Sequence, residues 1–302
     1  MEGAKKLLYL TIVIIAIIVI WLFLFTYPAK KSSRLLAFEK GRTLVIAHQG
    51  GSGLAPSSTI PAFLNAKALG ADVLEFDVHM TRDGHLVAIH DPTVDRTTDG
   101  SGRVNDMTLE EIQALDAGYF FQDEDGNYPY RGKGITIPTV EEIFTKTIDP
   151  KILYIIEIKH TNDPELYDSI ANNLWQTIQN FQLEERVIIA SFNQAIVDLV
   201  LKISKGKALV SAGRKEATQF VLFHKFRLNG LYRQRADAIH IPVKESGFNL
   251  KDKQLIRGAQ KRGMQVHYWT INDQETMKEL IALGADGIMT DYPDQLIELL
   301  NE

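Results

Sequence analysis

Two carboxylates and a histidine lie within one short stretch, EFDVHMTRDGHLVAIHD at 75–91. Glu75 and Asp77 are two residues apart in a β-rich run, so both side chains point to the same face of a strand. An Asp-Gly dipeptide at 83–84 separates this run from a second one, which is typical of a hairpin with a two-residue turn. With that turn, His90 lies roughly opposite Asp77. The stretch predicts a patch that binds a metal ion and moves a proton; the alternative is a strand with a solvated acidic edge.

A second pair with the same spacing, Glu157 and Lys159, ends the run ILYIIEIK at 152–159. The chain contains no cysteine. Three carboxylates without a thiolate favour a hard cation, Mg²⁺ or Ca²⁺, over zinc. Lys159 then faces the carboxylates or a bound phosphate. The alternative is an ion-pair cluster with a purely structural role.

His48 ends a β-rich run at 43–48 and is followed by Gln49 and two glycines. The glycines allow close approach of the backbone to a neighbour. Together with His90, His48 offers one base and one acid for cleaving an ester. A lone histidine is more often structural, but two at predicted strand ends beside three carboxylates favour catalysis.

From residue 43 onward, β-rich runs alternate with helical stretches. Leaving out the antiparallel return strand of the hairpin, eight strands begin near residues 43, 73, 152, 187, 207, 237, 265 and 286. This pattern predicts an α/β fold, a TIM (β/α)8 barrel with a small insertion at about 99–150 after the second strand. A doubly wound sheet is the alternative. Polar residues gather where barrel strands end, which is where barrels place their chemistry: His48, Glu75, Asp77, Glu157, Lys159, Ser191, Trp269 and Asp291.

The N-terminal region predicts a membrane anchor. Residues 7–29 carry no charge and span roughly 34 Å as a helix, enough to cross a bilayer. A cleaved signal peptide is the alternative, but Tyr27 stands where cleavage needs a small residue. Residues 30–42 form a tether whose Leu35, Leu36 and Phe38 close the bottom of a domain at 43–302. Flanking lysines give a weak orientation signal, and we expect the exported, single-pass arrangement.

The overall composition excludes little else. The chain has 302 residues and a formal charge of -5, which gives no indication of nucleic-acid binding. Nothing in the sequence indicates the oligomeric state. A basic, aromatic stretch at 219–233, QFVLFHKFRLNGLYR, is predicted either to lie on a membrane surface or to pack as a helix on the barrel.

Taken together, the motifs resemble those of the glycerophosphodiester phosphodiesterase family. They run in order from 43 to 300 and are AHQGGSGLAPSSTIPAF, EFDVHMTRDGHLVAIHDPTVDRTTDG, LDAGYFF, IPTVEEIF, EIK, ASF, WTIN and GADGIMTDYP. The resemblance implies a TIM barrel and metal-dependent hydrolysis of a glycerophosphodiester to sn-glycerol 3-phosphate and an alcohol, in lipid metabolism. It implies these roles: metal ligands Glu75, Asp77 and Glu157; acid-base pair His48 and His90; phosphate or substrate contacts Lys159, Gln49 and Trp269.

Two departures from the family pattern leave the substrate open. The family usually reads His-Arg-Gly where this chain has Gln49, and Pro-Glu-Asn-Thr where it has Pro56-Ser57-Ser58-Thr59. Losing the arginine removes a cation that helps to hold phosphate. The alternatives are therefore a lysophospholipase D acting on membrane lysophospholipids and a membrane-anchored phosphodiester-binding protein without catalysis.

Overall fold

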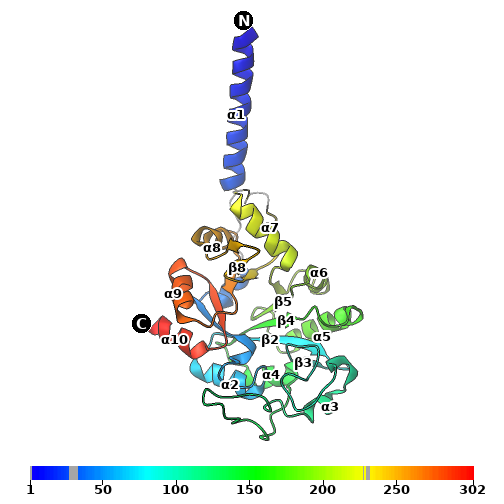
Figure 1. Ribbon diagram of the computed structural model, residues 1–302. Helices are drawn as coiled ribbons and strands as arrows, with labels where there is room; N and C mark the ends of the chain where they lie inside the picture. The colour runs from blue at the N-terminus through cyan, green and yellow to red at the C-terminus, as the bar shows by residue number, and fades with distance from the viewer. Residues whose placement is uncertain (1, 27–32, 227, 229–231) are drawn as a thin grey trace.

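A computed structural model, which describes residues 2–26, 33–226, 228 and 232–302, shows a ring of short parallel strands surrounded by helices (Figure 1). Each strand comes from a run rich in Val, Ile and Leu, which suits a sheet buried on both faces. The wall strands are β1 (Leu44–Ala47), β2 (Val73–Met80), β4 (Leu153–Ile158), β5 (Val187–Ala190), β6 (Leu209–Val210), β7 (Ala238–Ile241), β10 (Gln265–Tyr268) and β11 (Gly287–Thr290).

The ring of wall strands is closed. Their order is β6-β5-β4-β2-β1-β11-β10-β7. A parallel bridge between Ser211 and Ala238 joins the two end strands, and the Asp237 N–H donates to the Val210 carbonyl at 2.8 Å. The predicted TIM barrel is therefore confirmed, and the doubly wound sheet is excluded.

Helices cover the outside of the barrel and fill the connections. Gly70, with φ of 103°, ends α2 in the left-handed conformation that favours glycine. The predicted insertion contains α3 and α4, each begun by a Thr/Glu capping box. The helices and minor elements are α1 (Glu2–Thr26), η1 (Ser33–Phe38), η2 (His48–Gly50), α2 (Ile60–Leu69), η3 (Val104–Asp106), α3 (Leu109–Gln113), α4 (Val140–Thr147), η4 (Pro164–Leu166), α5 (Tyr167–Asn180), α6 (Gln194–Ile203), α7 (Arg214–Lys225), β8 (Lys244–Glu245), β9 (Phe248–Asn249), α8 (Lys253–Gln260), α9 (Gln274–Leu283) and α10 (Pro293–Asn301).

The predicted hairpin is present, but its register differs from expectation. β3 (Leu86–Ala88) runs antiparallel to β2, with Val78 opposite Ala88. The Ile89 N–H donates to the Asp77 carbonyl at 3.1 Å, so Ile89, not His90, lies opposite Asp77. The reason is the turn, which holds three residues between a hydrogen-bonded Thr81 and His85, with Gly84 left-handed at φ 88°.

The N-terminal region has two parts. α1 projects from the barrel as an isolated helix (Figure 1), and the stretch Glu2–Trp21 is long and apolar enough to cross a membrane. Residues 27–32, which include the end of the predicted anchor and the start of the predicted tether, lie outside the described residues. η1 packs beneath the strands: Leu35 and Phe38 are buried as predicted, whereas Leu36 is 65% exposed, contrary to expectation. Leu36 turns outward because only one side of this short helix faces the barrel.

Apolar packing fills the lower half of the barrel. Val73, Leu153 and Ile155, together with Leu35 and Phe38 from η1, form one buried cluster inside the ring of strands. A larger cluster lies between the strands and the outer helices. Polar side chains point into the ring only above this floor, toward the C-terminal ends of the strands.

Replacing Phe38 by alanine is expected to lower the free energy of unfolding of the barrel by about 3 to 5 kcal/mol, because it leaves a cavity beneath the strands. Leu36→Ala, a change at an exposed position of the same helix, is expected to alter it by less than about 0.5 kcal/mol. Urea unfolding of the full chain in mild detergent, followed by tryptophan fluorescence, measures both. Equal losses for the two variants would contradict the packing of η1 into the barrel floor.

Candidate active site

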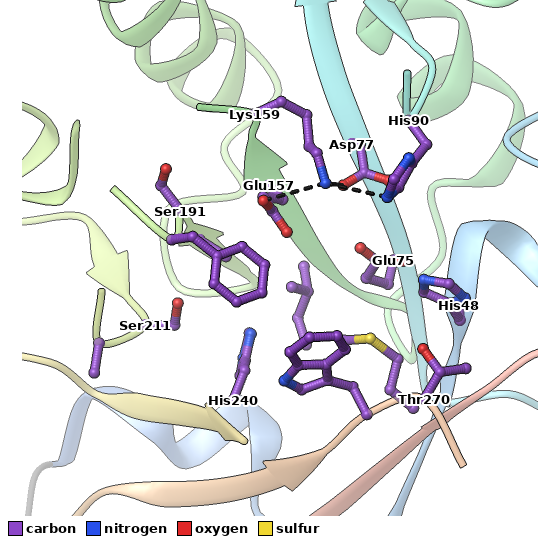
Figure 2. A pocket seen from close by; sticks show the side chains of 16 residues that line it. His48, Glu75, Asp77, His90, Glu157, Lys159, Ser191, Ser211, His240 and Thr270 are labelled. Atoms are coloured by element: carbon purple, nitrogen blue, oxygen red, sulfur yellow. Dashed lines mark hydrogen bonds and ion pairs between the residues drawn. The ribbon is translucent and has the colours of Figure 1, made fainter. Parts of the chain in front are cut away.

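A pocket of about 190 Å³ opens at the C-terminal ends of the wall strands (Figure 2). Seven of the eight polar residues expected at strand ends line it, namely His48, Glu75, Asp77, Glu157, Lys159, Ser191 and Trp269. The eighth, Asp291, is hydrogen-bonded to His48. His90 also lines the pocket. The structure therefore brings the predicted site residues together, with one exception, Gln49.

Strand register places the three carboxylates. β2 and β4 are parallel neighbours in which Asp77 pairs with Glu157 and Glu75 pairs with Ile155. Because side chains alternate along a strand, Glu75 lies one layer below Asp77 on the same inward face. Glu75 and Asp77 are only 4% and 2% exposed. Three carboxylates therefore share a space from which most water is excluded.

Lys159 is the cation that faces these carboxylates. Its Nζ lies 3.2 Å from Asp77 Oδ1, 3.4 Å from Glu157 Oε1 and 3.2 Å from His90 Nε2 (Figure 2). Burial lowers the pKa of Lys159, but the charges of Asp77 and Glu157 outweigh burial and raise it above its ordinary value. The ammonium is thus held in its charged form.

One ammonium does not satisfy the whole cluster. Burial and the charge of Asp77 raise the pKa of Glu75 to about 8 and that of Glu157 to about 7. Asp77 Oδ2 and Glu157 Oε1 are buried and have no hydrogen-bond partner among the described residues. The cluster is therefore short of positive charge, which is the condition that a divalent cation relieves.

The donor set fits such a cation in chemistry, although its spacing is not that of a formed coordination sphere. Among the described residues, no three His, Asp or Glu side chains converge closely enough to hold a metal ion. Lys159 Nζ stands instead within ion-pair distance of both Asp77 and Glu157. Small side-chain rotations of these residues would turn the unpartnered oxygens toward a common ion.

His48 is held by a carboxylate behind it. Its Nδ1 lies 2.6 Å from Asp291 Oδ1, and Asp291 also accepts hydrogen bonds from Ser52 and Asn272. Burial lowers the pKa of His48, but the hydrogen bond to Asp291 and the nearby charges of Glu75 and Asp77 outweigh it and raise the pKa to about 9. This arrangement fixes the ring and leaves Nε2 as the nitrogen that serves the pocket.

His90 is held in the same way on the other side of Lys159. Its Nδ1 lies 2.7 Å from Asp91 Oδ1, and Arg96 Nε donates to the other oxygen of Asp91 at 2.5 Å. His90 Nε2 therefore faces Lys159 and the pocket. The hairpin still delivers His90 to the carboxylates, although by a residue one position beyond the expected register.

Gln49 supports the site from beneath the pocket wall. It is buried, has a left-handed φ of 50°, and does not line the pocket. Its backbone N–H donates to Glu75 Oε2 at 2.9 Å, and its Nε2 lies 3.5 Å from His48 Nε2. The departure at 57–58 lies directly beside it, because the Ser58 N–H donates to the Gln49 carbonyl at 2.8 Å.

Aromatic and small polar residues form the opposite wall. Trp269 and Phe192 pack edge to face with centroids 5.3 Å apart. His240, predicted to be either a core residue or a pocket residue, lines the pocket, and its ring stacks on that of His267 at 5.2 Å. His79, by contrast, lies outside the pocket and contacts the backbone of His90 at 3.3 Å.

Sequence reasoning did not assign the residues that hold the two histidines. Asp91 directly follows His90, and Asp291 directly follows β11. Their positions next to a histidine and after a strand were the available signals, but a hydrogen bond between residues 243 positions apart, as for His48 and Asp291, is not visible in a single sequence.

Comparison with known proteins decides the family. Residues 48–295 match the model of the glycerophosphoryl diester phosphodiesterase family. A glycerophosphodiester phosphodiesterase of Caldanaerobacter subterraneus subsp. tengcongensis is 40% identical over 264 residues, 86% of this chain and 99% of that protein. The chain belongs to the glycerophosphoryl diester phosphodiesterase family.

Two further relatives extend this comparison. An Oleispira antarctica phosphodiesterase, solved in complex with the product sn-glycerol-3-phosphate, superposes with a TM-score of 0.69 at 25% identity, covering 88% of this chain and 99% of that one. A lysophospholipase D of Mus musculus is 26% identical over 307 residues, covering 92% of each chain. The family therefore includes relatives named for different substrates.

Asp291→Asn is expected to lower kcat by about 100-fold or more, because a neutral amide no longer holds and charges the imidazole of His48. The KM is expected to change little, since Asp291 does not line the pocket. Ser52→Ala, which removes only one donor to Asp291, serves as the matched control and should retain most activity. Steady-state choline release from glycerophosphocholine measures both variants, and unchanged kcat in Asp291→Asn would contradict this positioning role.

Proposed function

We propose that this glycerophosphodiester phosphodiesterase binds a divalent cation and hydrolyses glycerophosphodiesters to sn-glycerol 3-phosphate and an alcohol, as part of lipid metabolism. The observation that carries the proposal is the pair of buried, unpartnered oxygens, Asp77 Oδ2 and Glu157 Oε1, beside a buried ammonium. Two carboxylate-held histidines flank this cluster. A dianionic or monoanionic phosphate together with a cation satisfies such a site, whereas an uncharged substrate leaves it unpaired.

Glu75, Asp77 and Glu157 are the residues that would hold the cation, either Mg²⁺ or Ca²⁺, because both prefer carboxylate oxygens. When bound, the ion supplies a Lewis acid for a non-bridging phosphate oxygen. Lys159 contributes the second positive charge, which offsets the charge that develops on the phosphate. Phe192 and Trp269 form an apolar wall for the remaining part of the substrate.

The two histidines move the protons. As water, or a hydroxyl of the substrate, forms its bond to phosphorus, one histidine accepts its proton at Nε2. As the bond from phosphorus to the leaving oxygen breaks, the other histidine gives a proton to that oxygen. Asp291 and Asp91 each hold the Nδ1 side of one ring, at 2.6 Å and 2.7 Å, which leaves both Nε2 atoms for this exchange.

The same proposal includes a membrane anchor at 7–29, a connection at 30–42 and a catalytic barrel at 43–302, with the barrel outside the cytoplasm. Support for the anchor comes from an apolar helical stretch, Glu2–Trp21, that has no part buried against the barrel. A cleaved signal peptide passes the same test of length and composition. The intact mass of the protein extracted from membranes distinguishes the two, since loss of the first 29 residues would contradict anchoring.

A second candidate function is lysophospholipase D activity on membrane lysophospholipids. It is favoured by the murine relative of that name and by the apolar wall of Phe192 and Trp269. The segment 219–233 adds less support than its composition suggests, because Phe220 is buried and Phe223 packs against the core. Residues 227 and 229–231 of this segment lie outside the described residues.

Removing divalent cations with a chelator is expected to abolish hydrolysis, and adding back Mg²⁺ or Ca²⁺ is expected to restore it, because the buried carboxylates then regain a counter-ion. Glu157→Gln is expected to weaken the binding of the restoring ion, which isothermal titration calorimetry measures independently of activity. Glu165→Gln, an exposed position on η4, is the control. Full activity of the chelated enzyme would sink the metal proposal.

Glycerophosphocholine is expected to be hydrolysed with a higher kcat/KM than lysophosphatidylcholine, whether or not detergent is present, because the pocket of about 190 Å³ leaves little space for an acyl chain. Release of choline from each substrate, measured by the same coupled assay, provides the comparison. A preference for lysophosphatidylcholine above its critical micelle concentration would favour the second candidate instead.

A further inference from the structure

The chain enters the barrel at the end opposite to the pocket. η1 lies beneath the strands, where Phe38 is 1% exposed and its carbonyl accepts a hydrogen bond from Gln265 at 3.1 Å. Arg34 donates to the carbonyls of Lys207 and Ala208 and lies 3.6 Å from Asp237. These three residues precede or begin β6 and β7. The first described residues after α1 are therefore fastened to the N-terminal end of the barrel.

The length of the connection limits how the barrel can face a membrane. Seven peptide steps join Thr26 at the end of α1 to Ser33 at the start of η1, so they reach at most about 25 Å. β2, with 8 residues, alone spans roughly 26 Å along its own direction, and the insertion adds height on the pocket side. A barrel with its pocket against the membrane would need the whole connection stretched along its flank.

The N-terminal end of the barrel carries the charge that suits an anionic surface. A groove of about 920 Å³ lies between η1 and the turn after α8. Beside it, Leu36 is a large apolar side chain that is 65% exposed. Arg42 is partly neutralised by Asp72, at 2.7 Å. The exposed basic side chains on this end include Lys40, Arg42, Lys205, Lys207, Arg257 and Lys261.

Charge is distributed differently at the pocket end. The segment 91–139, which leads away from His90, holds ten acidic and four basic residues, a net charge of 4 − 10 = −6. An anionic bilayer repels this segment and attracts the lysines of the opposite end. On the N-terminal end itself, Glu184 and Glu185 lie on the far side from the groove, in the turn before β5. The basic half of that end is therefore the half that faces lipid.

We propose that the basic half of the N-terminal end, centred on Leu36, Lys207 and Lys261, docks on the anionic surface of the membrane that holds α1. The pocket then opens toward water. Resting on the proposed function, this orientation assigns the enzyme to water-soluble glycerophosphodiesters and separates it from lysophospholipids that reside in its own membrane. Short connection, exposed leucine and opposed charges each lead to the same orientation.

Because the chain has no cysteine, single introduced cysteines can report the orientation. The full chain carrying Leu36→Cys or Gln122→Cys, each labelled with a fluorophore, is reconstituted into phosphatidylcholine vesicles with or without phosphatidylglycerol and a lipid-attached quencher. Both positions are exposed, one on η1 and one in the acidic segment. The label at 36 is expected to be quenched in anionic vesicles and the label at 122 to stay unquenched. The opposite pattern, or equal quenching, would overturn the proposal.

Charge reversal tests whether the lysines hold this orientation. In the Leu36→Cys background, Lys207→Glu with Lys261→Glu is expected to reduce the docked fraction about fivefold or more, since each lysine near an anionic surface contributes about 1 kcal/mol. Lys133→Glu with Lys215→Glu makes the same change of charge at exposed positions away from this end and should leave quenching unchanged. Equal effects of the two double variants would show that net charge, not this surface, decides docking, and would overturn the proposal.

Hydrolysis by the same vesicles separates this proposal from the proposed function. Glycerophosphocholine added to the outer solution is expected to be cleaved as fast as in detergent, and lysophosphatidylcholine within the vesicle membrane is expected to be spared. Rapid cleavage of the embedded lysolipid would overturn the assignment to soluble substrates. If neither phosphodiester is cleaved in vesicles or detergent, the proposed function fails, whereas the orientation is still decided by the quenching pattern.

Discussion

The arrangement of this site depends on one buried ion cluster, Lys159 against Asp77 and Glu157, at 3.2 Å and 3.4 Å. Burying charges is costly unless they are paired. A single ammonium among three carboxylates leaves the cluster short of positive charge, which is why burial and Asp77 raise the pKa of Glu75 to about 8. The site is thus preorganised to gain free energy from a second cation and a phosphate that arrive together.

The barrel maintains this cluster through its floor. Apolar side chains from the strands and from η1 fill the ring below Glu75, and the parallel register sets Asp77 directly beside Glu157. A close-packed interior resists small displacements, so the carboxylates cannot separate to reduce their repulsion. The two histidines are oriented from outside the cluster, by Asp291 and Asp91, which leaves their inner nitrogens available.

Local patterns in the sequence predicted most of this architecture, and the exceptions have physical reasons. Two-residue spacing placed Glu75, Asp77, Glu157 and Lys159 correctly, because side-chain alternation along a strand is a local property. The position of His90 was off by one residue, because the number of residues in a turn depends on its hydrogen bonds. The partners of His48 and the pocket-facing direction of His240 arise from contacts between distant strands, which a single sequence does not reveal.

Attachment to a membrane and access to substrate make opposite demands on a barrel, and this chain separates them by using its two ends. The relative from Caldanaerobacter subterraneus is matched over 99% of its length by the barrel region, so the catalytic unit of the family does not require residues such as those of α1. A segment joined ahead of β1 must emerge at the N-terminal end of the barrel, because parallel strands all start there. Phe38 then completes the floor from that side, while the pocket at the other end remains unobstructed.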